Sequence, residues 1–297
     1  MSADPADEKR ARDDAHCEDL VRRGDYDRWL TSLFAPAEKR PRLLSLYAFN
    51  LEIARVRDLI SEPRLGEIRM QWWRDALEGE PSGESMAHPV AAGLFETIAR
   101  FNLPRKPFVD LIAARAFDLW DDPMPTLSDL EGYCGETSSS LMRLASLVLA
   151  DGADPGGADA TGHAGVAYAT TGILRALPWH TARGQIYIPG DVLARYGVAV
   201  ADLRERKTTS ALHQALGELR MRARDHLAKA RSCLDQMAQP ARPALAPLAL
   251  VEPYLRVMER RGYDPFATAI DLPSWRKVMA VWLGAGKLAK SLRASGR

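Results

Sequence analysis

The sequence lacks the features that mark several large classes of protein. Its three cysteines, Cys17, Cys134 and Cys233, are scattered without a CxxC pair or a metal-like spacing, so free thiols in a reducing compartment fit best. It has no uncharged apolar run of about 18 residues, the length that predicts a membrane span. Forty basic residues stand against thirty-nine acidic ones, so net charge gives no reason to expect nucleic acid as a partner.

Motifs for the common catalytic chemistries are also missing. The chain has no P-loop, no GxGxxG after a strand, no HExxH and no GxSxG. Cys134 lies in a helical pattern without a paired histidine, which argues against a thiol nucleophile. Residues 1–16 mix both signs of charge and lack an apolar segment, which predicts a solvated tail and neither a signal peptide nor a mitochondrial transit peptide.

The apolar residues that are present recur at helical spacing along almost the whole chain. Between Pro36 and Pro63 they repeat at alternating intervals of three and four, which predicts one helix of about six turns that carries Asp58. Helices are also predicted over 69–79, 90–101, 109–122, from a Thr126 or Ser128 cap to Ala150, over 210–237, and twice more after the Pro-rich stretch 240–253. Only residues 185–188 resemble a strand. We therefore expect an all-α single domain over 17–285, followed by a basic tail over 286–297.

Polar residues in two segments are predicted to line a pocket between facing helices, where bundles commonly build ligand sites. These candidates are Arg55, Asp58 and Glu62 in the first segment and Arg175, His180 and Arg183 in the second. The second group adjoins a stripe of small residues, Gly165, Ala169, Gly172 and Ala176, which lets another helix approach closely or roofs a cavity. Plainer explanations stay open: Arg55 and Asp58 as an intrahelical ion pair, and His180 as a helix-terminus residue.

Four stretches together resemble the squalene/phytoene synthase superfamily over about residues 20–235. They are LLSLYAFNLEIARVRD, the HPV at 88–90, DLEGYCGETSSSLM and GILRALPWHTARGQIYIPGDVL. The resemblance implies an isoprenoid-synthase-like helical bundle around a central cavity. It also implies two aspartate-rich motifs that hold Mg²⁺ on the diphosphates of two prenyl substrates, and it adds Tyr187 to the candidate cavity residues.

This chain departs from that pattern at the metal-binding positions. The first motif falls on Ala54 and Asp58, and the second on Ala176 and His180, with no Asp or Glu between Asp159 and Asp191. Magnesium prefers hard oxygen ligands, so Asp58 is a weak candidate on its own. We expect no metal, no cofactor and no catalytic residue, while a Mg²⁺-dependent head-to-head prenyl transferase stays the alternative. The basic residues either plug the site through ion pairs or bind an anionic head group.

A narrower resemblance extends from residue 17 to residue 79. Arg57-Asp58, Ser61-Glu62-Pro63, Gly66 and Arg69-Met70-Gln71 are similar to the branch of this superfamily that contains the mitochondrial complex I assembly factor. The resemblance implies a noncatalytic assembly or interaction factor with a respiratory-chain client, peripherally attached to a membrane. Because a transit peptide is not predicted, we expect a bacterial relative in the cytoplasm or on the inner membrane, with a cavity able to hold an isoprenoid or other lipid.

The last helix supplies an independent reason to expect a membrane surface. Trp275, Val278, Met279, Trp282 and Leu283 fall at helical spacing, and six basic residues with no acidic one follow Asp271. This pattern is typical of an interfacial helix, with Trp275, Trp282, Lys287 and Lys290 as the membrane-facing candidates. The alternative is a terminal helix docked on the core with a solvated basic tail.

Overall fold

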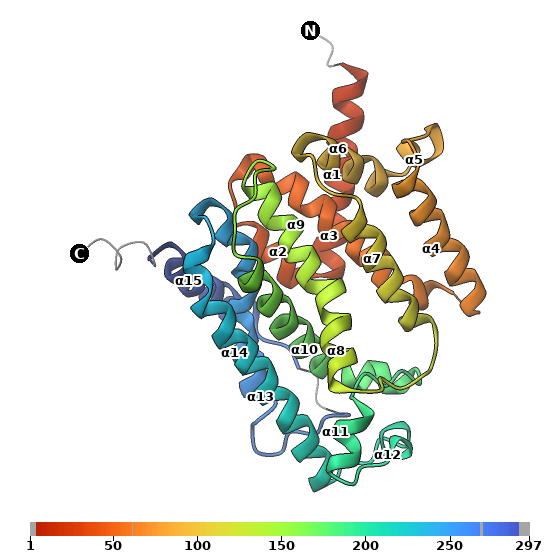
Figure 1. The fold of residues 1–297 in the computed structure, drawn as a ribbon, viewed down its shortest axis with the longest axis vertical. Coiled ribbons are helices and arrows are strands. Elements are labelled where there is room, and N and C mark those ends of the chain that lie inside the picture. Colours follow the sequence, from red (N-terminus) through yellow and green to blue (C-terminus); the bar gives the residue numbers. More distant parts are fainter. Residues whose placement is uncertain (1–3, 61, 268–269, 291–297) are drawn as a thin grey trace.

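The described part of the chain consists of helices and their connections (Figure 1). The computed structural model describes residues 4–60, 62–267 and 270–290. Within those residues the only β-type contact is an isolated bridge between Gly156 and Met237, so the all-α prediction is confirmed. The strand-like residues 185–188 form no strand; instead the Ile186 carbonyl accepts a hydrogen bond from the Met124 amide.

The described residues form a continuous series of helices joined by turns and loops. In chain order they are α1 (Pro5–Gly24), α2 (Tyr26–Ser32), η1 (Ala37–Lys39), α3 (Arg40–Ala54), η2 (Val56–Leu59), α4 (Pro63–Glu78), α5 (Gly83–Ala87), α6 (Pro89–Phe101), α7 (Lys106–Arg115), η3 (Ala116–Leu119), α8 (Leu127–Cys134), η4 (Gly135–Ser139), α9 (Ser140–Leu149), α10 (Ala158–Ala182), α11 (Gly190–Arg195), α12 (Val200–Arg204), α13 (Ser210–Ser232), η5 (Leu234–Gln236), η6 (Gln239–Leu250), α14 (Val251–Val257) and α15 (Ser274–Lys290). Helix α3 is buried along most of its length between α1, α6 and α9, and α10 packs along α13.

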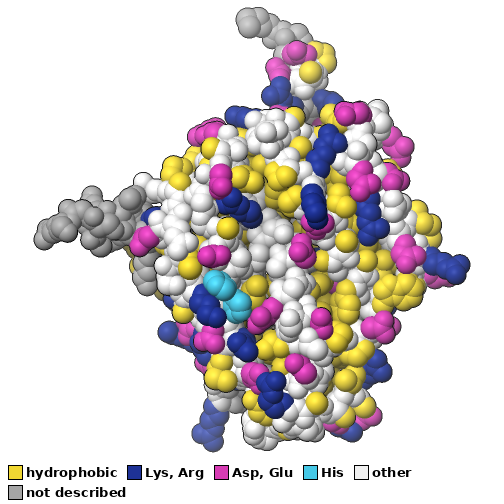
Figure 2. Space-filling view, in the orientation of Figure 1, with side chains coloured by type: hydrophobic (Ala, Val, Ile, Leu, Met, Phe, Trp, Pro, Cys, Tyr) yellow, Lys and Arg dark blue, Asp and Glu magenta, His cyan; other side chains and the backbone are white. Residues whose placement is uncertain are grey.

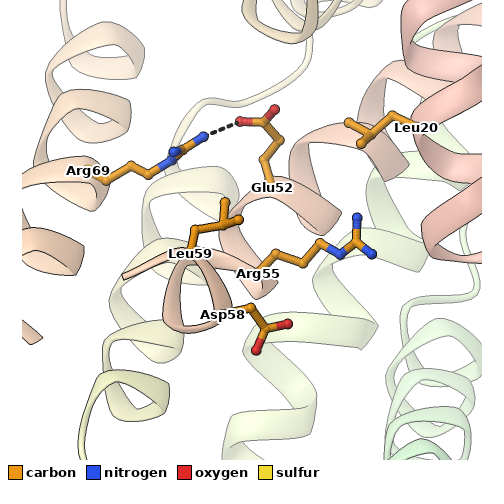
Figure 3. Close-up of a pocket in the computed structure, with 6 residues that line it drawn as sticks. All are labelled: Leu20, Glu52, Arg55, Asp58, Leu59 and Arg69. Atoms are coloured by element: carbon orange, nitrogen blue, oxygen red, sulfur yellow. Dashed lines mark hydrogen bonds and ion pairs between the residues drawn. The ribbon is translucent and has the colours of Figure 1, made fainter. Parts of the chain in front are cut away.

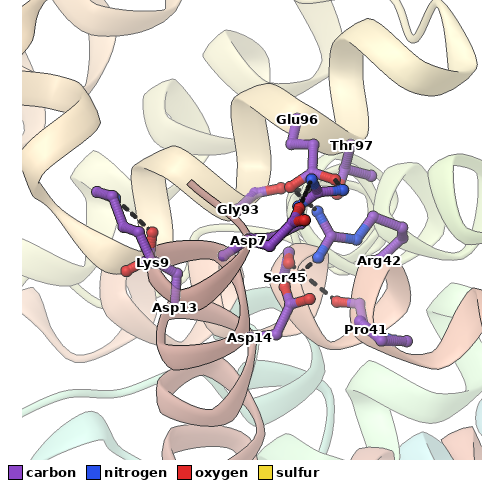
Figure 4. Close-up of polar contacts among 11 residues, drawn as sticks. Asp7, Lys9, Asp13, Asp14, Pro41, Arg42, Ser45, Gly93, Glu96 and Thr97 are labelled. Carbon is purple, nitrogen blue, oxygen red and sulfur yellow. Dashed lines mark hydrogen bonds and ion pairs between the residues drawn. The ribbon is translucent and has the colours of Figure 1, made fainter. Parts of the chain in front are cut away.

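Residues 5–16, which the sequence predicts as part of a solvated tail, form the first turns of α1 and are mostly exposed. Asp4 caps the helix and Pro5 begins it, as expected for a helix N-terminus. The buried Arg42 of α3 then pairs with Asp14 of α1 and, at 2.7 Å, with Glu96 of α6 (Figure 4). Charge mixing near the N-terminus therefore reflects ion pairing between helices.

Two segments that were predicted as single helices are interrupted. Helix α3 ends at Ala54, and the 3-10 turn η2 follows, so Asp58 lies on a tight turn and not on the face of a long helix. The predicted helix from Thr126, which does cap it, contains the π-helical turn η4 between α8 and α9. A side chain on Gly165 of α10 would collide with the backbone of Ser139 at the end of η4. Helical turns of this kind are common at functional sites.

The C-terminal boundary also differs from the prediction. Helix α15 continues to residue 290, beyond the expected start of a tail at 286, and residues 291–297 lie outside the described residues. The helix packs against η6 and α2. Among the described helices, none combines the length and apolarity that crossing a membrane requires.

Candidate functional site

A cavity of about 800 Å³ opens between α2, α10 and α14, at the place where the two predicted segments face each other. Ala169, Gly172 and Ala176 of the small-residue stripe line it, and a Cβ added to Gly172 would meet no atom within 4 Å. Gly165, one helical turn earlier, instead allows the close approach of η4. The stripe thus serves both expected purposes, close packing at one end and a cavity wall along the rest.

The positions that the family pattern assigns to metal ligands do not form a carboxylate pair. Ala54, Ala176 and His180 line the cavity, whereas Asp58 does not. The Asp58 carboxylate instead pairs with the guanidinium of Arg183, about halfway exposed to solvent. In the described residues no group of three or more His, Cys, Asp or Glu side chains could hold a metal ion. Because imidazole and methyl groups replace hard oxygen ligands, this donor set does not fit a pair of magnesium sites.

The two remaining candidates of the first segment lie away from the expected arrangement. Glu62 is exposed just before α4, makes no capping bond and lines no described pocket. Arg55 lines the cavity but makes no ion pair with Asp58. The structure thus places Glu62 outside the central cavity, and no intrahelical Arg55–Asp58 pair forms because the helix ends at Ala54.

Arg175 is held in a buried cluster on one wall of the cavity. Its Nη1 donates to Asp27 Oδ2 at 2.9 Å, and its guanidinium lies 3.7 Å from the centre of the Tyr254 ring. Tyr254 donates to the same carboxylate at 2.7 Å, and Lys277 Nζ of α15 lies 3.0 Å from it. Burial by itself raises the pKa of the Asp27 carboxyl, but Arg175, Tyr254 and Lys277 outweigh burial and lower it.

A second buried cluster, centred on Asp118, supplies Arg115, Tyr133 and Tyr187 to the lining of the same cavity. The Asp118 carboxylate accepts hydrogen bonds from Tyr133 at 2.8 Å, Tyr187 at 2.6 Å and Arg115 at 3.0 Å. The His180 ring lies 4.5 Å from the Tyr187 ring. Burial lowers the pKa of His180 to about 4, so its imidazole is neutral near pH 7.

Sequence reasoning missed the acids and tyrosines that organise both clusters. These residues lie in four separate helical elements: Asp27, Asp118, Tyr133 and Tyr254. Tyr133 belongs to the stretch DLEGYCGETSSSLM but was not selected as a candidate. For the other three, the only signal is a charged or hydroxyl-bearing residue at a core-facing helical position. Such a signal becomes specific only when the partner across the cavity is known.

The cavity wall also carries polar atoms without a partner among the described residues. These atoms are Arg115 Nε, Ser138 Oγ, Arg175 Nε and His180 Nδ1, and all four residues line the cavity. Ser138 is only 4% exposed. Since buried polar groups are nearly always hydrogen-bonded, these atoms suit the oxygens of a ligand or of ordered water.

The membrane-facing candidates separate into described and undescribed side chains. Trp275 and Trp282 of α15 are 60% and 66% exposed. Lys287 and Lys290 belong to the same helix, but their side chains lie outside the described residues.

Comparison with known proteins agrees with this geometry. The sequence model of the family described as squalene/phytoene synthase matches residues 21–281. The chain belongs to the squalene/phytoene synthase family. The predicted resemblance to this family, and with it the isoprenoid-synthase-like fold, is confirmed.

Curated relatives fall into two groups. NADH dehydrogenase (ubiquinone) complex I, assembly factor 6 of Rattus norvegicus is 33% identical over 88% of this chain and 82% of its own length. The Homo sapiens protein of that name is 31% identical over 89% of this chain and 82% of its own. The 15-cis-phytoene synthase of Synechococcus elongatus is 28% identical over 89% of this chain and 90% of its own.

Solved structures support the fold of this family member. The squalene synthase of Alicyclobacillus acidocaldarius aligns with a TM-score of 0.71 and 25% identity, over 86% of this chain and 97% of that one. A dehydrosqualene synthase aligns with a TM-score of 0.80 at 22% identity, over 98% of this chain and all of that one. The second likeness is one of fold alone.

Proposed function

We propose that this family member is a noncatalytic assembly or interaction factor for respiratory complex I and not a prenyl transferase. The observation that carries this proposal is the ion pair between Asp58 and Arg183. It joins the one surviving carboxylate of the metal-binding pattern to a cation, in a molecule where Ala54, Ala176 and His180 supply no carboxylate. A guanidinium repels Mg²⁺ and competes for the carboxylate.

The names of the related proteins also support an assembly role. Proteins named for complex I assembly are 31–33% identical to this chain over almost all of it. A phytoene synthase is 28% identical, which keeps Mg²⁺-dependent head-to-head prenyl transfer as the alternative. The two functions differ in their need for carboxylates in the cavity, because metal-assisted departure of diphosphate depends on them.

Helix α15 supports a peripheral attachment to a membrane surface. Its outward residues Trp275, Val278, Met279, Trp282 and Leu283 are 44–66% exposed, while Val281 on the other face is fully buried. The helix thus has one apolar face on the protein core and a second facing solvent, with Arg276 beside it. Apolar and aromatic side chains flanked by basic ones favour the interface of an anionic bilayer.

Vesicle flotation tests this membrane attachment. We expect the purified chain to float with phosphatidylglycerol-containing vesicles, and the W275S/W282S double variant to stay in the soluble fraction. Trp120→Ser is the matched control, because Trp120 is 47% exposed and lies outside both α15 and the lining of the central cavity. Equal flotation of all three proteins would reject α15 as the attachment site.

The partnerless polar atoms of the cavity wall favour a second candidate function, the binding of an anionic amphiphile without metal. Arg115, Ser138 and Arg175 each offer a buried donor, and donors to a phosphate or carboxylate give strong hydrogen bonds. This candidate is compatible with the assembly role, since a bound isoprenoid or lipid would fill the cavity without turnover.

Titration with farnesyl diphosphate separates these possibilities. We expect no release of pyrophosphate with or without Mg²⁺, and any binding to be independent of Mg²⁺. Magnesium-dependent release of pyrophosphate with a C30 product would overturn the noncatalytic assignment. Binding without turnover would support the amphiphile site. The assembly role itself is tested by deleting the gene in its native host: a normal amount of assembled complex I on native gels would reject it.

A further inference from the structure

A second hollow lies on the other side of Arg55, outside the central cavity. It has a volume of about 420 Å³ and is lined by Leu20, Glu52, Arg55, Asp58, Leu59 and Arg69 (Figure 3). Arg69 belongs to α4, which also exposes Leu65 and Ile68. We call the hollow together with these two side chains the α4 groove. Figure 2 shows hydrophobic side chains at the right-hand edge of the molecule, where Figure 1 places α4.

The groove exposes more apolar surface than its helices need for folding. Leu59 is 63% exposed, Leu65 49% and Ile68 67%. Helix α4 already buries a complete core face through Gly66, Met70, Trp73 and Leu77. Its exposed leucine and isoleucine therefore add nothing to the core, and clustered exposed apolar side chains mark interaction sites.

One of the positively charged side chains that line the groove takes part in no ion pair between described residues. Glu52 lies 3.4 Å from Arg69, and Asp58 pairs with Arg183. Arg55 is exposed and has no ion-pair partner among the described residues. In Figure 3 the Arg69 guanidinium is directed at Glu52, whereas that of Arg55 extends toward the side of Leu20. The groove thus presents fixed apolar side chains around a single unmatched positive charge.

The sequence stretch shared with the assembly-factor branch helps to build this groove. Asp58 and Arg69 of that stretch line it directly. Met70 is buried in the core, and a side chain on Gly66 would collide with Leu119. The central cavity therefore does not account for Asp58 and Arg69, and the groove does.

We propose that the α4 groove binds an amphipathic helix of the client protein. Leucine-type side chains of that helix pack against Leu59, Leu65 and Ile68, and one carboxylate pairs with Arg55. Helices bind grooves through apolar residues three and four positions apart. The two carboxylates already fixed in the groove, Glu52 and Asp58, argue against an anionic membrane as the occupant. This inference rests on the proposed assembly role, for which it names the contact surface.

Site-specific photo-crosslinking in the native host tests the proposal. The full chain carries p-benzoylphenylalanine at position 68 or, as the matched control, at position 221. Met221 is 59% exposed on α13, far from the groove. We expect position 68 to give a discrete crosslinked protein that position 221 does not give. The crosslinked segment should be an amphipathic helix with an acidic residue, and Arg55→Glu should reduce the product at least tenfold.

A charge exchange makes the test specific. Replacing the acidic residue of the crosslinked segment by lysine should restore the product in the Arg55→Glu background. The same pattern at positions 68 and 221, or an undiminished yield in Arg55→Glu, would overturn the proposal. Because Arg55 and Ile68 are exposed, unchanged circular dichroism should show that both variants fold.

The abundance of complex I separates this inference from the proposed function. If gene deletion lowers complex I but Arg55→Glu and Ile68→Asp do not, the groove assignment fails and the assembly role stands. If deletion leaves complex I unchanged while the crosslink and its charge exchange behave as expected, the assembly role fails and the docking surface stands for a different client.

Discussion

Replacing His180 by phenylalanine should flatten the pH dependence of stability. The imidazole is buried beside Tyr187, and burial lowers its pKa to about 4. Asp118 opposes this shift, while Arg115 and Arg183 reinforce it. The unfolded chain therefore binds a proton near pH 6.5 that the folded protein does not accept until about pH 4. Folding stability contributed by the neutral imidazole is lost as the pH falls through this window.

The magnitude follows from the two pKa values. With about 6.5 in the unfolded chain and about 4 in the folded protein, lowering the pH from about 7 to about 5 should cost roughly 2 kcal/mol through this one residue. Carboxyl groups that titrate at acidic pH contribute little to the change in unfolding free energy between pH 7 and pH 5. Asp27, whose pKa is lowered, loses its stabilising contribution only at still lower pH.

Urea unfolding of both proteins at pH 7, 6 and 5 provides the measurement. Phenylalanine keeps a ring against Tyr187 but cannot titrate, and the cavity beside position 180 leaves room for it. The lowered pKa values of His88 and His226 affect both proteins equally and cancel in the difference. Wild type should lose about 2 kcal/mol more than His180→Phe between pH 7 and 5. Parallel pH curves would refute the assignment of a buried, neutral imidazole.

Three further changes probe the packing. Gly165→Ala should lower the free energy of unfolding by about 1–3 kcal/mol, because the added methyl group collides with the η4 backbone. Gly172 faces open space, so Gly172→Ala should leave the free energy of unfolding unchanged or raise it by up to ~1 kcal/mol. Equal urea midpoints for the two variants would contradict this. Arg42→Met should cost about 2 kcal/mol, because it removes the ion-pair partner of Asp14 and leaves Glu96 with only Arg10, 3.7 Å away. A loss in urea titrations of less than ~0.5 kcal/mol would show that the pairs contribute little. Of the three thiols, only Cys233 should react quickly with a disulfide reagent at pH 8. Cys17 and Cys134 are buried, and burial raises their pKa values to about 12. Equal reaction rates for all three thiols would contradict this prediction.

The fold was predictable because helices leave a local signature. The intervals of three and four residues, the Thr126 cap and the prolines all act within one or two turns, and the structure agrees with them. The interruptions at Arg55 and over Gly135–Ser139 were not predictable in this way. They depend on what packs against the helix, such as the close approach of Gly165 to Ser139.

The candidate site was predictable only in part. Arg175, His180 and Tyr187 were found because they lie near a small-residue stripe or a family motif, and they do line the cavity. Asp27 and Asp118, which organise its walls, gave no such signal. Each of them acquires its role from partners far away in sequence, as Asp27 does from a tyrosine 227 positions later.

What the sequence by itself determined is the inventory of chemistry: an all-α chain whose metal-binding positions hold Ala54, Ala176 and His180. An absent carboxylate is absent in any conformation. What only the tertiary structure decided is the fate of Asp58, which could have faced a metal, Arg55 or open solvent. It pairs with Arg183, 125 positions away, because helix packing brings distant residues together and spacing along the chain reports only neighbours on one helix.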